Sequence, residues 1–319
     1  MSMFIKKCGF LIFIVLLTIG IIVFVIPFDK SSYLAANIDK QERLKILGSP
    51  KIVLIGGSNI AFSVNSEKIE KTFALPVVNM ALHAGIGLIY MLSEVKDYIV
   101  SGDVILVIPE YSHFFNDLNG GEEVLEVIFS FPANFRYIES SKQYFALLRA
   151  VPLRAQGKFM NYVTITAKRI ISHNQTPQSD EVYSRGAFNR NGDVISHLNK
   201  KSKREKVIRD SKSNLPSIKS FNKEAIKMLN DFYSYASERK ARVLFDFPDV
   251  LDIWYKNNEE KINFVYDRLK EELKIPIIGQ PQEYVFPIES FFDTMYHMNA
   301  EGRELRTQKV IADLTPFIQ

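Results

Sequence analysis

The sequence predicts an α/β protein, in which a three-layer α/β/α domain surrounds a five-stranded parallel sheet and one N-terminal transmembrane helix precedes it. Short apolar runs alternate with amphipathic helical patterns, which is typical of a parallel sheet covered on both faces. Hydrophobic residues make up 47% of the 319 residues, enough for a sizeable core. One segment near the N-terminus is uncharged over twenty residues, the length of a membrane-spanning helix.

The uncharged segment, residues 9–28, is predicted to be an uncleaved membrane anchor. Thr18 is its only polar side chain, and twenty helical residues span about 30 Å, the thickness of the hydrocarbon core of a bilayer. A cleaved signal peptide would have a shorter apolar core and a small-residue cleavage site after it. Ala35-Ala36 is a poor match to such a site.

The charges nearest the anchor predict its orientation. Lys6 and Lys7, within residues 1–8, favour a cytoplasmic N-terminus. Four basic residues in a polar connector with helical character, residues 29–50, favour the opposite orientation. Long domains translocate largely regardless of their charge, so we expect a single-pass protein of the bacterial cell membrane with its C-terminal domain, residues 51–319, outside the cytoplasm.

Three strands are predicted early in the domain, each an apolar run that ends at a turn: residues 51–55, 76–79 and 103–108. Two helices are expected between them. Asn65 or Ser66 can cap the first, which runs through Phe73, and apolar residues at helical spacing mark the second over residues 88–99.

The remaining strands are predicted near the end of the chain, at residues 242–246 and 275–278. Helices are expected around residues 226–236, at 258–273 and from Asn299 onward, because apolar side chains recur there at helical spacing. The chain therefore contains five strands in all.

An insertion of roughly residues 113–217 separates the third strand from the fourth. Its first part has helical apolar spacing and many aromatic residues, so it is expected to be largely helical. Its later part, 173–217, is polar and contains a basic run that is most simply a solvated face. A loop this long inside a compact domain is usually a lid, a binding loop or disordered.

Charge and cysteine content exclude several classes of function. There are 40 basic and 36 acidic residues, and no basic stripe with interleaved aromatics, so we expect no nucleic-acid partner. Cys8, the only cysteine, precedes the domain, which leaves no disulfide framework and no cysteine nucleophile there. His113 has no third ligand at metal-binding spacing, so we expect no metal and no cofactor.

Ser58 is the candidate nucleophile. It follows the first strand in Gly56-Gly57-Ser58-Asn59, and ligands of open parallel sheets bind at the carboxyl ends of the strands. A serine there could equally cap a helix or join a phosphate-binding loop. No GxGxxG or GxxxxGK[ST] pattern is present, which weakens the nucleotide interpretation.

A loop before the last helix supplies the other two groups that such a serine needs. A serine hydroxyl requires an adjacent base, and that base requires an orienting carboxylate. The loop offers His297 and Asp293 in Phe292-Asp293-Thr-Met-Tyr-His297-Met-Asn299. Alone, each residue is a surface or backbone-bonding side chain; with Ser58 on a neighbouring strand end, they predict catalysis.

Together these motifs resemble the SGNH (GDSL-like) hydrolase superfamily. The resemblance covers about 51–112 and 242–319, and it is closest to membrane-anchored DltD-like and alginate-acetylation-like members that modify cell-surface polymers. It implies a flavodoxin-like fold with strand order 2-1-3-4-5. It also implies Ser58 as nucleophile, His297 as base, Asp293 as orienting acid, and the Ser58 and Gly85 amides as the oxyanion hole.

The chain departs from the family's pattern twice. The family's Gly-x-Asn-Asp after the third strand is here Ile108-Pro109-Glu110-Tyr111, so the asparagine donor of the oxyanion hole is missing. Losing one such donor typically costs about 10²–10³ in rate. Asp293 and His297 are four positions apart, where the superfamily commonly has three. Asn59, His83 and Glu110 remain candidate pocket residues.

The predicted function is therefore an extracytoplasmic, serine-dependent transfer of an acyl group, by expectation acetyl, to a cell-surface or exported polysaccharide. The resemblance implies a membrane-bound O-acyltransferase as donor partner. Two alternatives stay open. One is a carbohydrate esterase (deacetylase) that runs the same chemistry to water, and the other is a non-catalytic accessory module of an O-acyltransferase system.

Overall fold

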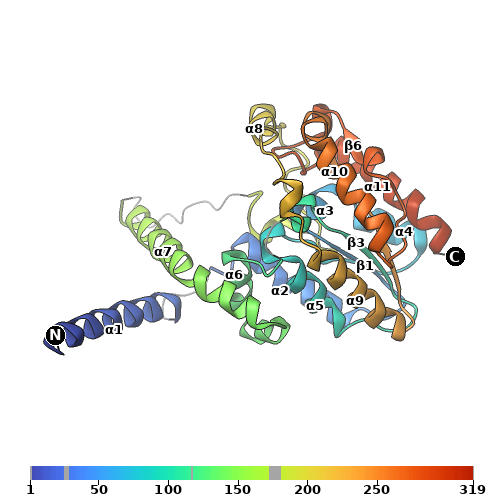
Figure 1. The fold of residues 1–319 in the computed structure, drawn as a ribbon. Coiled ribbons are helices and arrows are strands. Elements are labelled where there is room, and N and C mark those ends of the chain that lie inside the picture. The colour runs from blue at the N-terminus through green and yellow to red at the C-terminus, as the bar shows by residue number, and fades with distance from the viewer. Residues whose placement is uncertain (1, 25–28, 116–117, 172–180, 319) are drawn as a thin grey trace.

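A central parallel sheet with helices on both faces forms the body of the molecule, and two long helices extend from one side of it (Figure 1). The structure is a computed structural model that describes residues 2–24, 29–115, 118–171 and 181–318. The mixed α/β class predicted from the sequence is thus confirmed, together with the parallel sheet and the apolar N-terminal helix.

The sheet has four strands in the order β2-β1-β3-β4, all parallel. Their bounds are β1 Ile52–Gly56, β2 Val77–Asn79, β3 Val104–Ile108 and β4 Arg242–Phe245. β1 and β3 pair along their whole length, from Ile52 opposite Val104 to Gly56 opposite Ile108. Because all four strands run the same way, the residues that follow them meet at one edge, where Ser58 and Glu110 lie.

The predicted fifth strand does not form. Residues 275–278 lie beside β4 but make a single parallel bridge, between Ile277 and Phe245. Pro276 has no N–H to donate to a ladder, and the chain turns at once into the short helix η7, Pro281–Tyr284. A separate two-stranded sheet, β5 Val250–Leu251 with β6 Val285–Phe286, pairs nearby and was not predicted.

The strands send alternate side chains into two cores, one on each face. Val53 and Ile55 belong to one apolar cluster, whereas Ile52 and Leu54 belong to the other. The first cluster packs against α5 Leu88–Lys96, α9 Glu224–Glu238 and α10 Asp252–Glu272. The second packs against α3 Ser58–Ser63, α4 Ser66–Phe73 and α11 Ala300–Leu314. This three-layer arrangement agrees with the predicted layers.

The last helix docks onto the chain just after the first strand. Arg303 in α11 donates from Nε to the Val64 carbonyl at 2.7 Å, and the Asn65 amide donates to Thr307 Oγ1 at 2.8 Å. Asn65 also caps α4, as predicted, by accepting from the Lys68 amide. The two ends of the domain therefore form one layer.

The N-terminal segment forms α1, Ser2–Phe24, of which Met3–Ile22 is long and apolar enough to cross a membrane. It begins earlier than the predicted anchor, whose last four residues, 25–28, lie outside the described residues. The connector forms α2, Ala36–Ile46, as its helical character predicted. α2 is part of the body, since it packs beside β2.

The insertion has two parts with different roles. The first contains α6 Glu122–Ser130 and α7 Ser141–Ile171, and α7 extends away from the body beside α1 (Figure 1). The second, from residue 181 onward, includes α8 Arg204–Asp210 and lies against the body. Residues 116–117 and 172–180, including His173, lie outside the described residues.

The second part of the insertion is fastened to the body by a buried carboxylate. Residues 188–194 form a turn closed by a bridge between Phe188 and Val194, and this turn carries Asp193 inward. Asp193 accepts from the Ser66 hydroxyl and amide, from Asn79 Nδ2 and from Arg303 Nη2. The second part of the insertion, whose sequence is polar, is therefore an integral part of the fold.

Candidate active site

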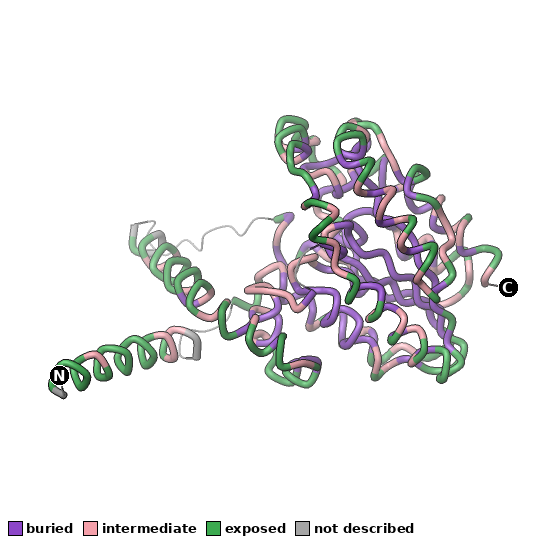
Figure 2. The backbone as a smooth tube through the Cα atoms, viewed as in Figure 1, coloured by how far each residue is buried: buried purple, intermediate pink, exposed green. Residues whose placement is uncertain are grey.

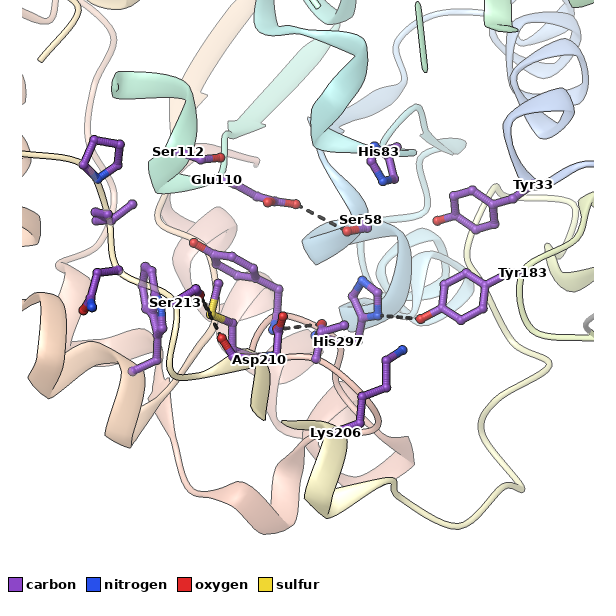
Figure 3. Close-up of a pocket in the computed structure, with 17 residues that line it drawn as sticks. Tyr33, Ser58, His83, Glu110, Ser112, Tyr183, Lys206, Asp210, Ser213 and His297 are labelled. Carbon is purple, nitrogen blue, oxygen red and sulfur yellow. Dashed lines mark hydrogen bonds between the residues drawn. The ribbon is translucent and has the colours of Figure 1, made fainter. Parts of the chain in front are cut away.

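A cavity of about 700 Å³ opens at the carboxyl edge of the sheet. Ser58, His83 and Glu110 line it from the segments after β1, β2 and β3, and His297 lines it from the loop before α11. Figure 3 shows these side chains around one space. The sequence-predicted groups, separated by up to 239 positions (297 − 58), thus come together.

Asp293 and His297 form the predicted acid–base pair. His297 Nδ1 lies 2.9 Å from Asp293 Oδ1, and both side chains are buried. Burial alone would raise the pKa of Asp293, but the hydrogen bond and charge of His297, with Lys206 and Tyr183, outweigh it and hold this pKa well below its usual range. The ionised carboxylate fixes a proton on Nδ1, which leaves Nε2 as the basic nitrogen. Asp293 and His297 therefore pair although they are four positions apart, one more than is common in the superfamily.

Two residues of the insertion also bind this carboxylate. Tyr183 donates to Asp293 Oδ2 at 2.6 Å, and Lys206 Nζ lies 2.7 Å from the same oxygen. Figure 3 shows both side chains beside His297. No local pattern predicts either role, because Tyr183 and Lys206 lie 110 and 87 positions from Asp293.

The imidazole ring is held flat against an aromatic ring. Phe62 of α3 stacks on His297 with ring centroids 3.9 Å apart and an interplanar angle of 4°. Phe62 lies one helical turn after Ser58, so the helix that begins at Ser58 also orients the His297 ring. Stacking and the Asp293 bond together restrict the ring to one orientation.

Ser58 is bonded to Glu110 rather than to His297. Its Oγ donates to Glu110 Oε1 at 3.4 Å (Figure 3), and within the described residues no hydrogen bond joins it to His297. Burial raises the pKa of Glu110 to about 7, and hydrogen bonds from the Asn59 backbone and the Ser58 hydroxyl offset only part of that effect. Near pH 7 this carboxyl group is therefore partly neutral and can donate a hydrogen bond.

Glycine at position 57 allows this close approach. Any Cβ there would collide with the Glu110 carboxylate, and a Cβ on Gly56 would lie 2.7 Å from the Ile108 carbonyl oxygen. The two glycines that signalled a tight turn are thus required by contact between the ends of β1 and β3.

The two amides predicted to form the oxyanion hole, those of Ser58 and Gly85, differ in their hydrogen bonding. Ser58 is the first residue of α3, where the backbone amides have no partner inside the helix. The Gly85 amide, in contrast, donates to His83 Nδ1 at 3.0 Å, so it is engaged in this arrangement. The amide nitrogen of the preceding residue, Ala84, lies close to Gly57: a Cβ added at Gly57 would be 3.2 Å from it. The oxyanion role of Gly85 stays a prediction.

His83 and Asn59, the other candidate pocket residues, differ in position. His83 lines the cavity, and burial lowers its pKa, so its Nδ1 accepts the Gly85 amide while Nε2 carries the proton. Asn59 is fully buried beneath the site. Its Nδ2 donates to the Ile108 carbonyl at 3.2 Å, which ties α3 to the end of β3.

Aromatic side chains that the sequence did not single out complete the cavity wall. They are Tyr33, Tyr183, Trp254 and Tyr296. Tyr33 comes from the segment before α2, and its hydroxyl donates to the Leu82 carbonyl at 2.9 Å. Trp254 is the only tryptophan of the chain. Aromatic walls with a few fixed polar groups are typical of small-molecule sites.

His113 and His197 serve the packing. His113 is buried, and its ring nitrogens lie 3.2 Å from the Glu110 carbonyl and 3.1 Å from the Ala84 carbonyl. His197 lies behind the site, with Nε2 2.9 Å from the Met298 carbonyl, and burial lowers its pKa to about 4. In the part of the chain that the structure describes, no three His, Cys, Asp or Glu residues are grouped to hold a metal ion.

The chain matches no protein-family model and no curated protein sequence. The resemblance to the SGNH superfamily therefore rests on the motifs around Ser58 and His297.

Proposed function

We propose that this protein is a serine-dependent acyl-transfer enzyme of the SGNH type. One observation carries the proposal. A buried Asp293–His297 pair opens on the same cavity as Ser58, at the carboxyl edge of a parallel sheet. A base held by a carboxylate and facing a serine is the arrangement that acyl transfer requires.

The proposed reaction runs in two halves. Ser58 turns from Glu110 toward His297, a change between staggered rotamers. Its Oγ then attacks the carbonyl carbon of an acyl ester while His297 Nε2 takes the hydroxyl proton. The donor C–O bond breaks, and its oxygen leaves with that proton. An acceptor hydroxyl next gives its proton to His297 and attacks the acyl carbon, and Ser58 leaves with the proton.

Glu110 takes the place of the family's missing asparagine in this proposal. It lies after β3, where that asparagine belongs, and it approaches Ser58 Oγ within 3.4 Å. A neutral carboxyl group can donate to the oxyanion of the tetrahedral intermediate, as an amide would. The raised pKa of Glu110 supplies that neutral form below about pH 7.

The acceptor in this proposal is a polysaccharide outside the cytoplasm, and the acyl group is acetyl. The aromatic and hydroxyl-bearing wall of the cavity suits sugar rings, and α1 keeps the site beside a membrane if it spans one. A membrane-bound O-acyltransferase would then supply the acyl donor. The family resemblance is the basis for that partner.

Labelling with a fluorophosphonate probe tests the catalytic unit without knowledge of the substrate. Ser58→Ala and His297→Ala should each abolish labelling, since members of such a unit act together and single losses reach about 10⁶. Asp293→Asn should retain more. Ser234→Ala, an exposed serine of α9, is the matched control and should label like the wild type. Equal labelling of Ser58→Ala would contradict the proposal.

The fate of the acetyl group distinguishes a transferase from a hydrolase. A transferase must keep water from the acyl-enzyme until an alcohol arrives. We expect weak hydrolysis of an activated acetyl ester, faster turnover with added oligosaccharide, and acetylated sugar as product. If the full chain instead removes acetyl groups from polymer, the esterase alternative replaces transfer.

The accessory-module alternative has one observation in its favour, the bond from Ser58 to Glu110 in place of a bond to His297. An accessory module would bind oligosaccharide equally well with Ser58 or Ala at this position. It would also leave no acyl-enzyme after incubation with an acetyl donor, whereas the proposed enzyme gains the mass of one acetyl group on Ser58.

A further inference from the structure

Helix α7, Ser141–Ile171, leaves the body of the molecule and exposes a broad apolar face. Leu148 is 65% exposed and Phe145 63%. The six residues that define this face are Tyr144, Phe145, Leu148, Phe159, Tyr162 and Val163. Figure 2 shows most of the helix as exposed, in contrast to the helices on the sheet. Exposed apolar patches of this kind mark binding surfaces.

The spacing of these residues places them on one side of the helix. Tyr144 to Leu148 and Phe159 to Val163 are steps of four, and Leu148 to Phe159 is a step of eleven, which is close to three turns. The protein occupies the other side of the helix, where Leu147 is buried and Arg154 pairs with Glu126 of α6 at 2.8 Å. Ala155 lies on the apolar side and is buried, so the exposed face has two parts, residues 144–148 and 159–163.

Every charged side chain of the helix is basic. The sequence from Ser141 to Ile171 contains no aspartate or glutamate. Lys142 and Arg149 are exposed, and they lie seven positions apart beside the apolar face. A helix with an apolar face edged by basic residues and free of acidic ones is suited to a membrane surface that contains anionic lipid.

The neighbour of α7 points to the same partner. α7 contacts α1, and both helices extend from the same side of the body (Figure 1). Among the described helices, only α1 is long and apolar enough to span a membrane; α7 carries basic residues and Pro152 within it. A helix that cannot span but touches a spanning helix lies near the membrane surface.

We propose that α7 is an interfacial helix, with Tyr144, Phe145, Leu148, Phe159, Tyr162 and Val163 inserted among the lipids and Lys142 and Arg149 on anionic headgroups. The body is then held at two places, by α1 through the membrane and by α7 along its surface. This inference is independent of the chemistry at Ser58. It requires only that α1 enters a bilayer.

Depth-dependent quenching of a fluorescent label tests the proposal in the full chain. Cys8→Ala removes the only cysteine, and an environment-sensitive label is then placed at Leu148→Cys on the apolar face. Asn161→Cys, exposed on the same helix but away from that face, is the matched control, and Leu16→Cys within α1 reports correct insertion. The chain is reconstituted in vesicles of phosphatidylcholine, with or without phosphatidylglycerol, that contain a spin-labelled lipid.

The Leu148 label should be quenched several-fold more than the Asn161 label when phosphatidylglycerol is present. That difference should shrink in phosphatidylcholine alone and in the double variant Lys142→Gln, Arg149→Gln. Strong quenching at Leu16 with equally weak quenching at Leu148 and Asn161 would overturn the proposal. If the Leu148 label becomes shielded only after a membrane protein is added, the face binds a protein partner instead. If the quenching is the same with and without phosphatidylglycerol, the assignment of Lys142 and Arg149 to anionic headgroups is wrong.

Discussion

Glu110 couples the protonation of the site to the stability of the fold. Its carboxyl group is buried beside Ser58, and burial raises its pKa from an ordinary 4.5 to about 7. The folded state therefore binds this proton more tightly than the unfolded state does. The contribution of Glu110 to stability is fully present below about pH 4.5 and is lost as pH rises through 7.

We expect Glu110→Gln to remove this pH dependence, because a neutral amide keeps the hydrogen-bonding shape without an ionisable group. Relative to the wild type, the variant should gain on the order of 2 kcal/mol in unfolding free energy between pH 5 and pH 8. Chemical unfolding followed by the fluorescence of Trp254 measures it. A constant difference between the two proteins across that range would contradict the raised pKa.

Lys206 should tune the base through Asp293. Its ammonium group lies 2.7 Å from the carboxylate that orients His297. Its hydrogen bond helps to hold the pKa of Asp293 well below its usual range, so Lys206 keeps the carboxylate ionised and in place beside His297. Lys206→Met should therefore slow fluorophosphonate labelling several-fold.

Lys203→Met is the control for that loss. Lys203 lies on the same segment, but its ammonium group is over the Phe292 ring rather than on Asp293. Its removal should leave the labelling rate unchanged, and Lys206→Arg should restore much of the wild-type rate. An unchanged labelling rate in Lys206→Met would mean that Lys206 contributes only to the fold.

Secondary elements were easier to predict than the contacts that fasten them. Four of five strands formed where apolar runs end at turns, because burial on both faces of a parallel sheet leaves that signal in the sequence. The fifth, residues 275–278, failed because Pro276 removes a donor from a short edge strand. Tyr183 and Lys206 reach Asp293 only through the tertiary path of the insertion, which no local pattern encodes. The placement of Ser58, Asp293 and His297 near one cavity could be predicted because turn chemistry and a helix start mark their positions, and their catalytic roles stay a prediction.

The turn over residues 188–194 fastens the insertion to the body through Asp193. Replacing Asp193 with Ala would leave the buried Arg303 guanidinium without its carboxylate and the Ser66 amide and hydroxyl without their acceptor. Breaking a buried pair in this way costs about 3–5 kcal/mol.

We therefore expect Asp193→Ala to lower the unfolding free energy by that amount, measured by denaturant unfolding with Trp254 as the probe. Asp39→Ala is the matched control, since Asp39 pairs with Arg185 at the surface and such pairs contribute at most about 1 kcal/mol. Equal losses in the two variants would show that Asp193 does not hold the insertion.

At the scale of the whole molecule, α1 and the charges around it predict an extracytoplasmic domain. Gln308→Cys, exposed on α11, in a Cys8→Ala background should react with a membrane-impermeant maleimide in intact spheroplasts as fast as after lysis. Cys8 in the wild type should react only after lysis. Reaction of the Gln308→Cys variant only in lysed cells would reverse the orientation.

The docking of α11 onto the chain after β1 sets an order of events during synthesis. Ser58 leaves the ribosome 239 residues before His297 (297 − 58), which at 5–20 residues per second is roughly 10–50 s. During that interval the nascent chain holds Ser58 without the loop that carries Asp293 and His297. In the enzyme proposed above, acyl transfer therefore begins only after the last helix has been made, and a chain truncated before residue 297 is inactive.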